Sequence, residues 1–191
     1  MSITYDSSVY VVKTDSLPNA FTSADQLDAF IKDKDSRLWG ATRSGWMHWV
    51  LRDVSIGYGI KNLAFMGINC GDTKLERIDL DYYPDGAYAH YYASVISGNR
   101  LSEVVGDIER LIDLSIKNTS IVAKLMEHHT DSEEVLSAAK DSSISRGPRI
   151  EVGDEGEGPW YFFTYLRTFK GICEAAKLEG SSVFYVQDTP A

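Results

Sequence analysis

Two runs of alternating residues, joined by Pro84-Asp85-Gly86, constrain the fold more than any other part of this chain. The whole stretch covers residues 75–95. In its first run Ile78, Leu80 and Tyr82 alternate with polar residues, and a period of two is typical of a β-strand with one buried face. Because a Pro-Asp-Gly sequence between two such runs favours a tight turn, the stretch predicts a β-hairpin.

The length of that turn decides which residues of the hairpin face one another. If Asp85 and Gly86 form a two-residue turn, Asp81 lies opposite His90, close enough for a hydrogen bond between carboxylate and imidazole. If the turn contains three residues, the register moves by one and His90 faces Leu80. The sequence leaves both registers open.

Further strand patterns fill the first half of the chain. Ser23-Ala24-Asp25-Gln26 has the spacing of a capping box, which predicts one helix after it. Connections between the remaining strands are short, and short connections favour an antiparallel meander. The strands expected before the hairpin cover residues 9–13, 37–41, 46–52 and 62–68.

The second half of the chain has helical spacing instead. Apolar residues recur every three or four positions from Leu101, with Ser102 as the candidate cap, and shorter helices are expected over 120–129 and from Ser132. The clearest helix runs from Pro159, which suits a first helical turn, to Leu178, just before a stop at Gly180. A strand over 183–186 then closes the chain.

These patterns predict one α+β domain over residues 1–191, a length sufficient for one well-cored domain. We expect a largely antiparallel sheet formed mainly by residues 1–97, packed against helices from residues 98–191, with a closing C-terminal strand. A Gly- and Glu-rich loop is expected at 142–158, because its glycines and carboxylates resist regular packing.

The charge of the chain limits the partners it can have. Its 28 Asp and Glu against 19 Lys and Arg leave a net charge of −9, and a negative surface repels the phosphates of nucleic acid while attracting basic proteins. No apolar run approaches the roughly 18 residues that a membrane-spanning helix needs, and no signal-peptide pattern is visible at the start. We therefore predict a cytoplasmic protein with a basic protein partner and with neither nucleic acid nor membrane as a ligand.

Residues able to bind metals or cofactors do not form a known motif. His128 and His129 are adjacent near an expected helix end, and adjacent helical residues point about 100° apart, which suits one metal poorly. Cys70 and Cys173 are too far apart for a metal cluster and are expected to be small buried apolar residues. We predict no metal and no cofactor.

Two functions fit this sequence. The first is a non-catalytic acidic binding protein that masks or neutralises a basic protein, similar in composition alone to immunity and inhibitor proteins, since tyrosines beside carboxylates suit protein recognition. The second is a small enzyme, such as a hydrolase, with an acid/base site between the hairpin and the 142–158 loop. The binding hypothesis uses Asp79, Asp81, Tyr83, Tyr88, His90 and Tyr92, and the enzyme hypothesis uses Asp81, His90 and Glu151. Oligomeric state is not indicated by any pattern.

Overall fold

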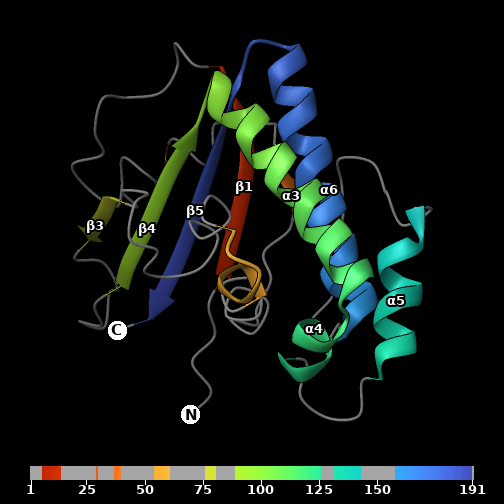
Figure 1. Ribbon diagram of the computed structural model, residues 1–191. Helices are drawn as coiled ribbons and strands as arrows, with labels where there is room; N and C mark the ends of the chain where they lie inside the picture. The colour runs from red at the N-terminus through yellow and green to blue at the C-terminus, as the bar shows by residue number, and fades with distance from the viewer. Residues whose placement is uncertain are drawn as a thin grey trace.

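A computed structural model describes residues 6–13, 29, 37–39, 54–60, 76–80, 89–125, 131–142 and 158–190 of the chain. Within these ranges the protein is a mixed α+β structure, with helices beside an antiparallel sheet (Figure 1). The strands are β1 (Asp6–Val12), β2 (Arg37–Trp39), β3 (Glu76–Leu80), β4 (Ala89–Ile96) and β5 (Ser182–Pro190). The helices are α3 (Asn99–Lys117), α4 (Ser120–Leu125), α5 (Ser132–Lys140) and α6 (Pro159–Leu178).

The described strands form one antiparallel sheet in the order β2-β1-β5-β4-β3. The last strand of the chain therefore lies in the middle of the sheet, between β1 and β4. This corrects the expected meander, because β4 pairs not only with its neighbour in sequence but also with β5, which follows the four helices α3 to α6. The return of the C-terminal strand to the sheet is confirmed, but that strand is central and longer than predicted.

The core lies between one end of the sheet and the helices α3 and α6. Val183 of β5 is paired with Val11 on one side and with Ile96 on the other, and all three are buried in the same apolar cluster as the inner residues of the helices. Paired residues of neighbouring strands lie on one face of a sheet, so this face is the one that the helices cover. Figure 1 shows α3 and α6 running side by side on that face.

Helix α6 has the bounds that its sequence predicts. Pro159 stands at the first helical position. At the other end Gly180 has a φ of 65°, while its N–H donates to the carbonyl of Lys177 and the N–H of Ser181 donates to the carbonyl of Ala176. These two bonds make a Schellman motif, whose left-handed position favours glycine. Phe162, Tyr165, Leu166, Phe169, Ile172 and Cys173 are among its buried residues.

The start of α3 differs from the prediction. The helix begins at Asn99 behind Gly98, so Ser102 lies inside the first turn and is not the cap. The reason is the short connection from β4, which ends at Ile96: Gly98 adopts a φ of 55° there and reverses the chain within a few residues.

The starts of α4 and α5 are confirmed. The side-chain oxygen of Asn118 accepts hydrogen bonds from the backbone N–H and the hydroxyl of Ser120. At α5 the carboxylate of Asp131 accepts from the N–H of Glu134 at 2.7 Å, which satisfies one of the free N–H groups of a helix start. The expected end of α4 at residue 129, the capping box at 23–26 and the strands over 46–52 and 62–68 fall outside the described residues.

Candidate functional site on strands β3, β4 and β5

Strands β3 and β4 form the expected antiparallel pair, and β3 is the last strand of the described sheet order. Asp79 is in β3, while His90 and Tyr92 are in β4. Three of the predicted site residues are thus brought to one pair of strands. Asp81, Tyr83, Tyr88 and Glu151 lie outside the described residues, as does most of the 142–158 loop.

The register of this pair corrects both alternatives drawn from the sequence. His90 is paired with Asp79, and Leu80 with Ala89, so neither Asp81 nor Leu80 lies opposite the histidine. Both alternatives assumed a particular turn at 84–86, and because each one-residue change at a turn moves the register by one, the pairing of β3 with β4 differs from them by two residues and by one. The shift from Asp81 to Asp79 is two residues and keeps a carboxylate on the same face, because the period of a strand is two.

Strand β5 adds a third residue opposite the histidine. Thr189 is paired with His90, so Asp79, His90 and Thr189 occupy adjacent positions on three neighbouring strands, which lie about 4.8 Å apart. We call this set the Asp-His-Thr row. The same alternation places Arg77, Tyr92 and Gln187 in a parallel row two residues away. Sequence reasoning missed Thr189 and Gln187, because the apolar run ends at Val186 and the polar residues after it carry no strand signal.

The Asp-His-Thr row lies far from the helix-covered end of the sheet. His90 and Ile96 share a face of β4, because an even number of residues separates them, and the distance between them is about 20 Å at the usual rise of a strand. In Figure 1 the end of β4 at Ile96 leads directly into α3, whereas Ala89 and the end of β5 lie at the opposite end of the sheet. The row is therefore well separated along β4 from Ile96, which belongs to the described core.

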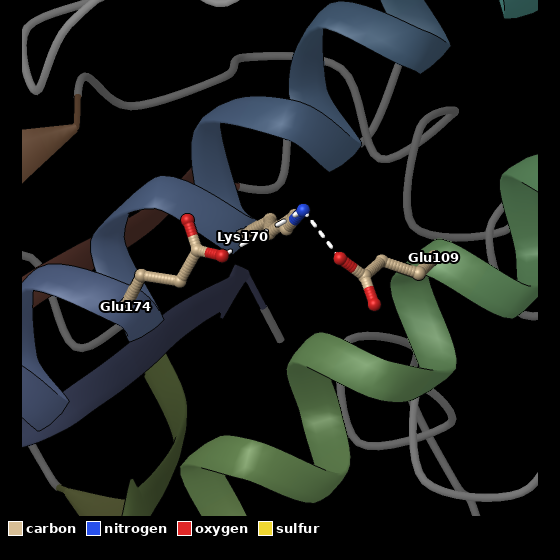
Figure 2. A network of polar contacts seen from close by, with 3 residues as sticks. All are labelled: Glu109, Lys170 and Glu174. Atoms are coloured by element: carbon tan, nitrogen blue, oxygen red, sulfur yellow. Dashed lines mark hydrogen bonds and ion pairs between the residues drawn. The ribbon is translucent and has the colours of Figure 1, made fainter.

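Charged groups on the helices are used to hold the helices together. Lys170 of α6 donates to Glu109 of α3 at 2.6 Å and lies 3.6 Å from Glu174 one turn further along (Figure 2). The hydrogen bond to Glu109 is the main reason that the pKa of Lys170 is raised. Because both carboxylates are half exposed, this bridge contributes at most about 1 kcal/mol to stability.

Arg167 of α6 has a structural position too. Its guanidinium donates to the carbonyls of Ala138 at 3.2 Å and Ala139 at 2.5 Å, in the last turn of α5. These are carbonyls that an α-helix leaves without partners at its end, and a cation there also interacts favourably with the helix dipole. Burial lowers the pKa of Arg167, which nonetheless stays charged at any physiological pH.

Within the described residues, neither the cysteine nor the acidic groups form a nucleophilic or metal-binding site. Cys173 is fully buried in α6, and desolvation raises the pKa of its thiol to about 12, so the thiolate that a nucleophile or a metal ligand requires does not form. This confirms Cys173 as a small buried apolar residue, while Cys70 lies outside the described residues. Where side chains are described, no group of three or more His, Cys, Asp or Glu could hold a metal ion.

The remaining predicted features stay as predictions. His128, His129 and the acidic residues of the 142–158 loop fall outside the described ranges. None of the helices in the described ranges combines the length and the apolar character needed to cross a membrane.

Comparison of the chain with models of known protein families, with curated proteins and with solved structures found no match. The function therefore has to be argued from the residues themselves.

Proposed function

We propose that this chain is an acidic binding protein that masks a basic partner protein through its β3–β4 hairpin. The observation that carries the proposal is the position of β3 at the end of the described sheet order, with Asp79 on it and His90 and Tyr92 on the adjacent strand. An edge position suits recognition, since a partner can approach an outer strand more readily than a central one.

The overall charge supports a basic partner. A net charge of −9 produces an attractive field for cationic surfaces, and such fields raise association rates by about tenfold or more at low salt. On the helices two carboxylates, those of Glu109 and Glu174, are paired with Lys170. Tyr92 adds an aromatic residue to β4, and aromatic residues supply the apolar contact area that charge alone lacks.

The test compares two variants that remove the same amount of charge. The tagged chain is used to capture its partner from a lysate of its own host, and the captured protein is purified. Asp79→Asn with Asp81→Asn should slow association about tenfold at low salt and flatten the salt dependence, because the attraction at the interface is lost. Glu133→Gln with Glu134→Gln, on the exposed first turn of α5, is the matched control and should stay near the parent rate.

Two results would contradict the proposal. Equal slowing by both double variants would mean that only net charge matters and that the hairpin is not the interface. Failure to capture any basic protein under low-salt conditions would remove the binding function altogether.

A small hydrolase is the second candidate function, and one specific observation favours it. The sequence suggested Asp81 and His90 as an acid/base pair without a nucleophile, whereas the backbone register pairs His90 with Asp79 on β3 and with a hydroxyl residue, Thr189, on β5. A carboxylate, an imidazole and a hydroxyl are the three groups that acyl-transfer enzymes combine.

A further inference from the structure

Helix α5 is attached to the core by small side chains. Its buried residues are Val135, Ala138 and Ala139, and all three belong to the same apolar cluster as the inner residues of α3 and α6. Figure 1 shows α5 beside the first half of α6. Because the hydrophobic effect scales with the apolar area removed from water, one valine and two alanines stabilise this contact less than the buried phenylalanines of α6 stabilise theirs.

The end of α5 is joined to α6 by one guanidinium. Arg167 donates to the carbonyl of Ala138 at 3.2 Å and to that of Ala139 at 2.5 Å. The guanidinium also lies 5.9 Å from the centre of the Phe163 ring, one turn earlier on α6, and a cation over an aromatic face is attracted to it. Hydrogen bonds from a charged donor are stronger than those between neutral groups, so these two bonds are a main attachment of α5.

The length of α5 decides what happens when that attachment is lost. The helix contains nine residues, whereas an isolated helix in water is marginal below about 12 to 15 residues. The hydrogen bond that caps its start joins Glu134 to Asp131 within the same segment, so it does not fasten α5 to another helix. An α5 released from α6 therefore unfolds.

We propose that α5 opens and unfolds as a local unit while α3 and α6 stay folded, and that the two hydrogen bonds of Arg167 hold it closed. Elements with few buried apolar contacts open below the free energy of global unfolding, and the segments that move when a protein responds to a ligand are drawn from them. Opening exposes the guanidinium of Arg167 and the apolar surface that α5 covers. This device is independent of the β3–β4 hairpin and goes beyond the proposed binding function.

Native-state hydrogen exchange of the full-length chain in increasing urea tests the opening. The amides of residues 135–141 should exchange about tenfold or more faster than those of residues 166–172 in α6. Their exchange should also depend less on urea, because a local opening exposes less surface than global unfolding does. Equal rates and equal urea dependence in the two sets would overturn the proposal, since α5 would then open only when the whole chain unfolds.

Two variants test the role of Arg167. Arg167→Met removes the guanidinium and keeps an apolar stem, and it should accelerate exchange in α5 by a further factor of about ten or more while α6 stays near the parent rate. Lys170→Met is the matched control, because Lys170 is paired with Glu109 and Glu174, and it should leave exchange in α5 within about twofold of the parent.

Unchanged exchange of α5 in Arg167→Met would contradict this role, as would equal acceleration of α5 by both variants. The comparison of α5 with α6 in the parent chain needs no variant, so it decides whether α5 opens locally even if Arg167→Met does not fold.

Discussion

Single side chains of α6 show how much of this protein depends on contacts that sequence patterns do not reveal. Arg167 joins α5 and α6 by donating to two backbone carbonyls that are nearly thirty residues away in sequence. Nothing in the local sequence distinguishes it from a solvated arginine of an amphipathic helix. Cys173 is the opposite case, because its position on the apolar stripe of α6 predicted its burial correctly.

At the same scale, the buried thiol of Cys173 makes stability depend on alkaline pH. Its pKa is about 12 in the folded chain against about 8.5 in an unfolded one. The stabilisation that comes from this difference in pKa is fully present below about pH 8.5. As the pH rises from there towards 12, the thiol loses its proton in the unfolded state but keeps it in the folded state. The free energy of unfolding should therefore fall by about 1.4 kcal/mol per pH unit across this window.

The measurement is denaturant unfolding at several pH values in a Cys70→Ser background, which leaves Cys173 as the only thiol. Adding Cys173→Ala should remove the part of the pH dependence of the unfolding free energy that comes from this thiol. The part that comes from other titrating groups should remain. Identical slopes with and without the thiol would show that Cys173 is accessible to water in the folded state.

Among the elements, α6 was the easiest to predict, because its apolar spacing, its N-terminal proline and its C-terminal glycine all agree. Strand β5 was recognised only in part. Its apolar residues over 183–186 were evident, whereas its polar continuation through Gln187 and Thr189 is a strand because β1 and β4 pair with it on both sides. Pairing between distant segments can override weak local propensity.

The packing of α6 leads to a prediction with an internal control. Phe169 is 2% exposed in the core cluster, whereas Leu178 on the last turn is 88% exposed. Phe169→Ala should lower the free energy of unfolding by about 3 to 5 kcal/mol through lost burial and a cavity. Leu178→Ala should change it by less than about 0.5 kcal/mol. Thermal or denaturant melting of the two variants, side by side, is the measurement.

Similar losses in both variants would contradict this assignment of the buried face. A Phe169→Ala variant that melts like the parent would also do so, since the ring would then not contribute to the core.

For the molecule as a whole, the sequence indicated the fold class and the hairpin but not how the strands are ordered. Sheet order depends on which segments meet in space, and β4 and β5 are separated in the chain by α3, α4, α5 and α6. The candidate site shows the same limit. Asp79, His90 and Tyr92 were predicted from one local stretch, but Thr189 joins them only through the order β5-β4-β3.

The candidate site rests on the register that pairs His90 with Asp79 on one side and with Thr189 on the other, and this register can be measured directly. In an antiparallel sheet, directly paired residues give strong nuclear Overhauser effects between their backbone protons, and a chain of 21.3 kDa is within reach of the method with isotope labelling. We expect such contacts from His90 to Asp79 on one side and to Thr189 on the other. Contacts from His90 to Asp81 or Leu80 instead, or the absence of contacts between β4 and β5, would contradict the account.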